Sequence, residues 1–153
     1  VAQAFGMEVL VSRKIGEPDD TPGRIPFEDL VQQVDYLSLH CPLTAATDKM
    51  IDAGTLSRMK PGAFLINTAR GGLVDPPALI DALRTGTIAG AAIDVLDREP
   101  PADDEALLDT GLDNLIVTPH NAWGAIESRR RLVDQMRENI ESWLEDRPVR
   151  VVT

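Results

Sequence analysis

The sequence is poor in the features that mark several classes of protein. It has one cysteine, Cys41, in 153 residues, which excludes an internal disulfide framework and suits a reducing cytoplasm. No apolar run approaches the roughly 18 to 20 residues of a membrane span, and the start, VAQAFGMEVLV, lacks the charged region of a signal peptide. Lys and Arg number 15 against 25 Asp and Glu, for a net charge of −10. We therefore expect a cytoplasmic protein with no membrane or nucleic-acid partner.

Short apolar runs alternate with helical patterns along the chain. The runs are apolar at nearly every position, which is typical of parallel strands covered on both faces. They lie at residues 8–11, 36–40, 63–69, 91–96 and 115–120. Helical patterns lie at 27–34, 52–59, 75–85 and 124–145, and an acidic surface loop at 97–111. The alternation predicts right-handed βαβ units and a Rossmann-like, doubly wound parallel α/β sheet.

The phosphate-binding motif of such a sheet, Gly-x-Gly-x-x-Gly, is absent from the sequence. In a dinucleotide-binding fold that motif precedes the end of the second strand by about 20 residues. Counting back from Ser12 leads to a point before the chain begins. We therefore take 8–11 as the second strand, 36–40 as the third and 63–69 as the fourth. The first strand and its glycine loop are expected to be missing, so that the chain is part of a longer protein.

Polar side chains follow each expected strand at its carboxyl end, where open α/β sheets bind ligands. They are Ser12, Arg13 and Lys14 after the second strand, His40 after the third, in a run with Cys41 and Pro42, Thr68 and Arg70 at the end of the fourth, Asp94 in the fifth with Glu99 beyond it, and His120 at the end of the sixth. Each residue alone also has a structural explanation, such as an ion-pair role for Arg70. Their shared edge of the sheet favours a binding site. No metal-ligand spacing is present, so we predict no metal.

Three of these side chains, His120, Glu99 and Arg70, predict a division of labour. Histidine exchanges a proton with a hydroxyl or carbonyl oxygen near neutral pH. A carboxylate bonded to the imidazole fixes its tautomer and favours its acid form, and the arginine fork matches a substrate carboxylate. Such a site can hold a 2-oxo acid and protonate its carbonyl oxygen, with the reductant supplied by a bound nucleotide.

Four motifs, in order, resemble the D-isomer-specific 2-hydroxyacid dehydrogenase family and cover nearly the whole chain. They are HCPLT…T (40–47), MKPGAFLINTARGGLVD (59–75), AAIDVLDREPP (91–101) and NLIVTPHNAW (114–123). The resemblance implies that Arg70 binds the substrate carboxylate and carbonyl, and that His120 is the general acid/base with Glu99 as its partner. The residues that it places near the cofactor are Thr47, Thr68, Ala69, Arg70, Asp94 and His120, with backbone from the loop of His40, Cys41 and Pro42.

Within the family, the segment PHNAWGAIESRRRLVDQM is most similar to glycerate dehydrogenases, also called hydroxypyruvate (glyoxylate) reductases. Trp123 is the main cue, although it could simply pack the base of the long helix. The resemblance implies a homodimer of two-domain subunits. Residues 1–145 would be most of the NAD(P)-binding domain, and 146–153 a tail returning toward the missing substrate domain. Two alternatives stay open: a nucleotide-sensing regulator derived from a dehydrogenase, and a fragment that is inactive as it stands because its cleft cannot close.

The residues after the second strand bear on the choice of cofactor. NAD-selective folds usually place Asp or Glu there, to bond the ribose 2′-hydroxyl. This sequence has Ser12, Arg13 and Lys14 instead, and these groups suit the 2′-phosphate of NADP. Glu8 lies at the wrong end of the strand. NADP is therefore the predicted cofactor; if Arg13 and Lys14 are only a solvated turn, NAD stays possible.

Overall fold

The computed structural model describes residues 1–16 and 18–151. The chain divides into two compact units, Val1–His120 and Asn121–Thr153. The first unit contains η1 (Ala2–Phe5), β1 (Val11–Ser12), β2 (Arg24–Ile25), α1 (Phe27–Val31), β3 (Tyr36–Leu39), α2 (Ala53–Arg58), β4 (Phe64–Asn67), η2 (Gly71–Leu73), α3 (Pro76–Arg84), β5 (Gly90–Ile93) and β6 (Leu115–Val117), where η is a 3-10 helix. The second unit contains α4 (Ile126–Leu144). The predicted domain boundary after residue 145 stays a prediction, and the last two residues of the predicted tail lie outside the described residues.

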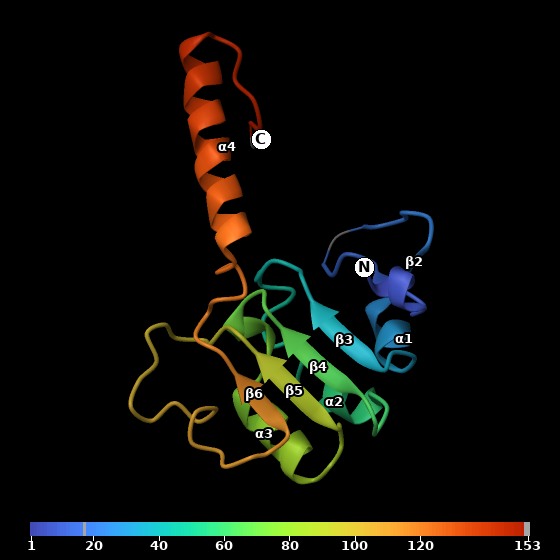
Figure 1. Ribbon diagram of the computed structural model, residues 1–153. Helices are drawn as coiled ribbons and strands as arrows, with labels where there is room; N and C mark the ends of the chain where they lie inside the picture. Colours follow the sequence, from blue (N-terminus) through green and yellow to red (C-terminus); the bar gives the residue numbers. More distant parts are fainter. Residues whose placement is uncertain (17, 152–153) are drawn as a thin grey trace. The chain divides into compact units, whose positions relative to one another are not determined.

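Four parallel strands form the main sheet, in the order β3-β4-β5-β6. Their arrowheads all point the same way in Figure 1, so their carboxyl ends meet at one edge. Each crossover between neighbouring strands is long enough for a helix or a loop, as parallel pairing requires. The predicted parallel α/β fold is confirmed. Among the described helices, none has the length and apolar character that crossing a membrane would take.

The prediction for the first strands was wrong in two respects. Only Val11 and Ser12 of that region are in a strand, and β1 pairs with β2 in a separate two-stranded sheet. Backbone groups need a partner to form a strand, and residues 8–10 pair with none of the described strands. In addition, β3 lies beside β4 rather than beside β1. In the strand order that the sequence predicted, β3 therefore has the position of the fourth strand. The position of the third strand belongs to β2, which was not predicted.

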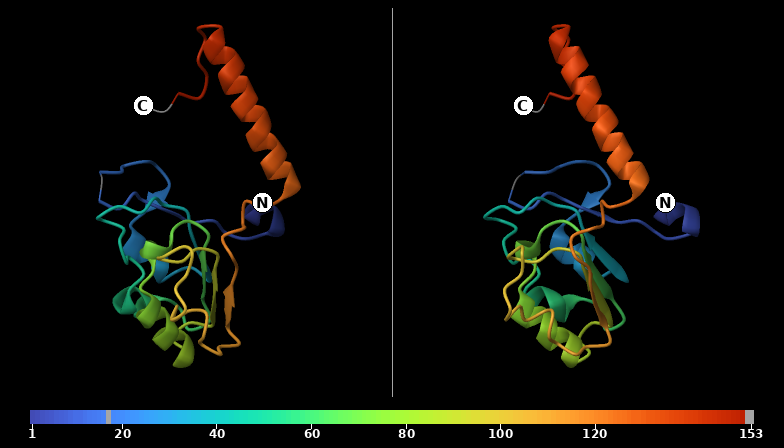
Figure 2. Two further views of the ribbon diagram at one scale, coloured as in Figure 1. Left: turned by 90° about the vertical axis from the view of Figure 1, so that its left-hand side faces the viewer. Right: turned by 60° about the vertical axis from the view of Figure 1, so that its left-hand side comes forward.

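The two faces of the main sheet differ in burial. Leu37, Leu65 and Ala91 lie in one register row and are buried in the core that α1, α2 and α3 help to form. In Figure 2 the helices α2 and α3 lie on one side of the sheet. On the opposite face, Tyr36 and Phe64 stack with ring centroids 5.4 Å apart, and both are exposed. Among the described residues of this unit, the helices thus cover one face, and the other face, which was also expected to be covered, is exposed at Tyr36 and Phe64.

The helix signals of the sequence give mixed results. Asp52 caps α2 by accepting a hydrogen bond from the Thr55 N–H at 2.7 Å. The α3 helix begins after Asp75, as predicted, and Gly86 follows its end with φ 72°, a conformation that glycine adopts readily. The large apolar side chains of α4 form a helical stripe, and no residue of this helix is buried. The exposed side chains are Leu132, Val133, Met136, Ile140, Trp143 and Leu144.

Candidate active site

Buried polar side chains gather at the carboxyl edge of the main sheet. Four polar or charged residues are buried among the described residues, namely Thr47, Thr55, Asn67 and Asp94. All but Thr55, which lies in α2, belong to the strand ends or loops at this edge. A buried polar group is costly unless it is hydrogen-bonded. Each of the three is bonded, and each bond fixes the path of a loop that carries predicted site residues.

Asn67, the last residue of β4, shapes the turn that presents Arg70. Its side chain is 1% exposed. Its amide nitrogen donates to the Arg70 carbonyl at 2.8 Å, and its amide oxygen accepts from the Ala69 N–H at 3.1 Å. Thr68 and Arg70 are exposed at this turn, and one guanidinium N–H of Arg70 donates to the Ala69 carbonyl. The sequence analysis missed Asn67, although an asparagine that ends a buried strand is a signal for such a turn.

The glycine after Arg70 brings two loops together. A Cβ on Gly71 would lie 2.1 Å from the Leu96 carbonyl carbon and 2.3 Å from the Asp97 nitrogen. Only glycine allows the backbones to approach this closely. The segment that presents Arg70 is therefore packed against the segment that leads to Glu99.

Glu99 and His120 form the predicted pair. The Nδ1 of His120 lies 2.5 Å from the Oε2 of Glu99. The other carboxylate oxygen, Oε1, accepts the Leu96 N–H at 2.9 Å. This backbone bond and, next, the bond with His120 hold the pKa of Glu99 below its usual value. His120 has φ 51°, in the left-handed region. Nδ1 thus faces the carboxylate, and Nε2 is the other nitrogen of the ring.

Asp94 and Thr118 form a second contact between the ends of β5 and β6. The Thr118 hydroxyl donates to Asp94 Oδ1 at 2.5 Å, and the Asp94 side chain is buried. The Asp94 N–H also donates to the Asn67 carbonyl at 2.9 Å. Asp94 thus ties three neighbouring strand ends together. Its predicted place near the cofactor stays a prediction.

The loop after β3 is closed by Thr47. The Thr47 hydroxyl donates to the Pro42 carbonyl at 2.8 Å and accepts the Thr44 N–H at 2.8 Å. His40 is exposed and its Nε2 lies 2.9 Å from the Ser38 hydroxyl. Burial raises the pKa of the Cys41 thiol, which keeps it protonated. The predicted cofactor contacts of this loop stay predictions.

Ser12 ends β1, and Arg13 and Lys14 follow it, at the carboxyl end where the ribose 2′ substituent was predicted to bind. Arg13 and Lys14 are exposed. The Arg13 N–H donates to the Ile25 carbonyl at 2.8 Å, which continues the β1–β2 pairing by one residue. The Ser12 hydroxyl donates to the Arg13 carbonyl at 2.8 Å.

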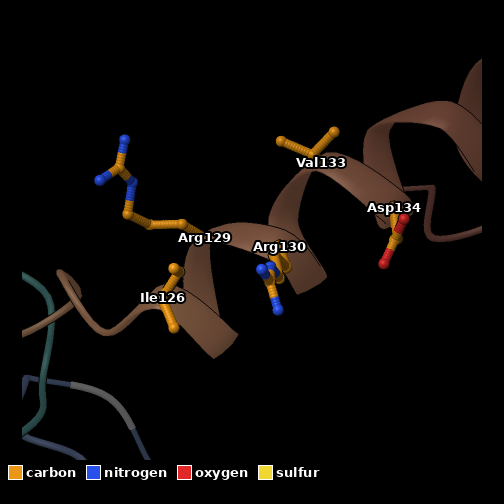
Figure 3. A pocket seen from close by; sticks show the side chains of 5 residues that line it. All are labelled: Ile126, Arg129, Arg130, Val133 and Asp134. Carbon is orange, nitrogen blue, oxygen red and sulfur yellow. The ribbon is translucent and has the colours of Figure 1, made fainter.

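Within residues 1–16 and 18–151 no group of three His, Cys, Asp or Glu side chains could hold a metal ion. The depression in Figure 3 is lined by residues of α4 alone and contains none of the predicted site residues. The residues that line the depression are Ile126, Arg129, Arg130, Val133 and Asp134.

The parallel sheet, with its bonded polar edge, defines an α/β domain of the nucleotide-binding type. Residues 1–122 match the family described as D-isomer specific 2-hydroxyacid dehydrogenase, NAD binding domain. The chain belongs to this family. Glycerate dehydrogenase of Methylorubrum extorquens is 48% identical over 151 residues, which are 99% of this chain and 47% of that protein. The predicted resemblance to glycerate dehydrogenases and hydroxypyruvate reductases is confirmed.

Two solved structures share this fold. The NAD complex of a D-isomer specific 2-hydroxyacid dehydrogenase from Lactobacillus delbrueckii ssp. bulgaricus has a TM-score of 0.84 and 31% identity, and the match covers 99% of this chain and 50% of that chain. The NADPH-dependent glyoxylate/hydroxypyruvate reductase from Sinorhizobium meliloti, in complex with NADP and malonate, has a TM-score of 0.74 and 34% identity, over 97% of this chain and 47% of that chain. The present chain thus spans about half the length of the relatives it matches.

Proposed function

We propose that the full-length protein containing this chain reduces a small 2-oxo acid, hydroxypyruvate or glyoxylate, with NAD(P)H, to give D-glycerate or glycolate. The observation that carries the proposal is the contact of 2.5 Å between His120 Nδ1 and Glu99 Oε2 at the edge where such sheets bind ligands. The names of the relatives, glycerate dehydrogenase and hydroxypyruvate reductase, support this substrate class.

His120 is the proposed proton donor, and the geometry names the atom. Its Nδ1–H donates to Glu99, so the transferable proton sits on Nε2. The imidazolium gives this proton to the carbonyl oxygen of the 2-oxo acid, and a neutral imidazole remains, held in one tautomer by Glu99. Arg70 binds the carboxylate of the substrate through its planar fork. A bound nicotinamide supplies the hydride that reaches the carbonyl carbon.

The edge of the sheet fits a nicotinamide nucleotide. The carboxyl ends of four parallel strands meet there, and buried Thr47, Asn67 and Asp94 fix the loops between them. The residues proposed to hold the nucleotide are His40, Cys41 and Pro42 through their backbone, with Thr47, Thr68, Ala69 and Asp94. Solved relatives contain NAD in one case and NADP in another.

Of the two nucleotides, NADPH is the proposed cofactor. Arg13 and Lys14 are exposed after β1, and two cations there favour a 2′-phosphate over a free 2′-hydroxyl. Ser12 adds a hydroxyl next to them. The positively charged side chains are therefore the basis of the proposal.

The test is the oxidation of NADPH and of NADH by the full-length protein, followed by absorbance, with hydroxypyruvate and with glyoxylate. Oxidation with NADPH at a much lower KM than with NADH supports both parts of the proposal. Oxidation with NADH alone keeps the reaction and rejects NADPH. A folded protein that binds nucleotide and oxidises neither cofactor with any small 2-oxo acid contradicts the enzyme proposal and favours a nucleotide-sensing regulator.

A further inference from the structure

Asp19 is the most heavily bonded side chain of the loop between β1 and β2. Its side chain is 4% exposed, whereas most of the loop is exposed. One carboxylate oxygen accepts the Lys14 N–H at 2.8 Å and an Arg24 guanidinium N–H at 2.9 Å. The other accepts the Thr21 N–H at 3.1 Å and the Thr21 hydroxyl. Four donors therefore converge on one carboxylate that the proposed reaction does not use.

These bonds fix the path of the segment proposed to select the cofactor. The backbone of Lys14 is tied through Asp19 to the side chain of Arg24 in β2. The preceding residue, Arg13, is tied through its N–H to Ile25 in the same strand. The backbone that carries both cationic side chains is thus held at two successive residues. The Thr21 hydroxyl, first, and the Lys14 N–H hold the pKa of Asp19 far below its usual range, so these bonds persist at every pH at which proteins normally work.

The same loop is packed against the other loop proposed to hold the nucleotide. Gly16 has φ 79°, and a Cβ there would lie 2.4 Å from the Cβ of Ala46. Ala46 belongs to the segment 40–47, which Thr47 closes. The path of the β1–β2 loop is therefore set at one side by Asp19 and at the other by contact with this neighbouring loop.

We propose that Asp19 is a positioning residue for cofactor selection, which acts by holding the Ser12, Arg13 and Lys14 segment in the shape that receives the ribose 2′ substituent. This inference rests on the proposed function. Charge alone predicts the opposite sign, because a carboxylate repels a phosphate and also neutralises Arg24. Removal of Asp19 therefore tightens NADPH binding if only charge matters, and weakens it if position matters.

The experiment compares Asp19→Asn and Asp19→Ala with Asp20→Asn in the full-length protein. Asp20 is the matched control, because it is adjacent, exposed and carries the same charge, and no side-chain hydrogen bond is recorded for it among the described residues. KM for NADPH, KM for NADH, KM for the 2-oxo acid and kcat are measured for each protein. We expect KM for the preferred cofactor to rise about tenfold in Asp19→Ala, since charge-assisted hydrogen bonds are lost. Asp19→Asn keeps an acceptor and should show a smaller rise.

The outcomes separate this inference from the proposed function. The expected pattern leaves kcat and KM for the 2-oxo acid within about twofold of wild type, and leaves Asp20→Asn unchanged or with a slightly lower KM for NADPH. An unchanged or lower KM for the preferred cofactor in both Asp19 variants overturns the inference. A fall in kcat together with a rise in every KM value also overturns it, because that pattern indicates a purely structural role. If the wild-type protein prefers NADH, only the NADPH proposal is rejected. The Asp19 variants are then compared by their KM for NADH.

Discussion

Asn67 and Glu99 do the same kind of work in opposite environments. Asn67 is 1% exposed and neutral, and it holds the turn that ends at Arg70 through two hydrogen bonds to the backbone. Glu99 is exposed and charged, and it holds the ring of His120. A buried neutral amide gives a fixed position that does not depend on pH. An exposed carboxylate stabilises the fold little but fixes the orientation of the ring that it bonds. Arg70, the proposed substrate-binding residue, is thus supported by a buried side chain, and His120, the proposed proton donor, by an exposed one.

The largest effect on kcat is expected at His120, whose ring Glu99 holds. His120→Asn removes the proposed proton donor, so kcat should fall by roughly 100- to 10,000-fold. Asparagine is the appropriate replacement because it tolerates the φ of 51° at this position better than alanine does. The measurement is turnover of NADPH with hydroxypyruvate, with nucleotide affinity as the control. Nucleotide affinity should stay within about twofold, and a kcat near that of wild type would remove His120 from its assigned role.

The next largest effect on activity is expected at Arg70, whose turn Asn67 holds. Arg70→Ala removes the fork that matches a carboxylate, so kcat/KM for the 2-oxo acid should fall by about 100-fold, with KM raised and kcat lowered. Arg70→Lys keeps the charge and loses the bidentate geometry, so it should recover only part of the loss. Steady-state kinetics of the three proteins decide the matter. Equal kinetics for Arg70→Ala and wild type would mean that another residue binds the carboxylate.

Truncation of the buried support should affect both stability and substrate binding. Asn67→Ala removes the amide that donates to the Arg70 carbonyl and accepts from the Ala69 N–H. This loss should lower the free energy of unfolding by about 2 kcal/mol and raise KM for the 2-oxo acid. Asn114→Ala is the control, because the Asn114 amide also bonds backbone carbonyls, those of Leu83 and Ala89, at the start of β6. Chemical denaturation and kinetics are measured together. The account fails at this point if both variants raise KM for the 2-oxo acid equally.

Removal of the charge of Glu99 should have the smallest effect on the free energy of unfolding. The pKa of Glu99 is lowered, so its contribution to stability is present above the ordinary carboxyl pKa and is lost as the pH falls through the lowered folded value. Because the group is exposed, Glu99→Gln should change the unfolding free energy at pH 7 by less than about 1 kcal/mol. It should nevertheless lower kcat by about tenfold. Denaturation curves at pH 7 and pH 3.5 test the first part, and a gap between the two proteins that widens at low pH would contradict it.

The comparison also explains what the sequence could reveal. Glu99 and His120 were predicted because acid and imidazole groups at strand ends have few structural uses, and because the motifs around them resemble a family. Asn67 was not predicted, since its function follows from burial and from two bonds that only the folded turn brings together. The same holds for Asp19, whose partners at residues 14, 21 and 24 are assembled by the loop.

The fold was predicted where hydrophobic periodicity is strong and missed where it is weak. β3 to β6 are apolar runs that pack on a helical layer, and their period and order along the chain were sufficient. β2 has two residues in a polar, proline-bearing stretch, and pairing with β1 rather than side-chain pattern makes it a strand. The apolar stripe of α4 is a true helical stripe, but periodicity alone does not say what the stripe packs against.

The most direct test of the account is the chirality of the product. If Arg70 and His120 hold a 2-oxo acid in one orientation against a nicotinamide, hydride reaches only one face of the carbonyl. Hydroxypyruvate would be reduced by the full-length protein with NADPH, or with NADH if that is the cofactor used, and the glycerate resolved by chiral chromatography. The account predicts D-glycerate alone, with one nucleotide oxidised per molecule formed. L-glycerate or a mixture of the two enantiomers would contradict it.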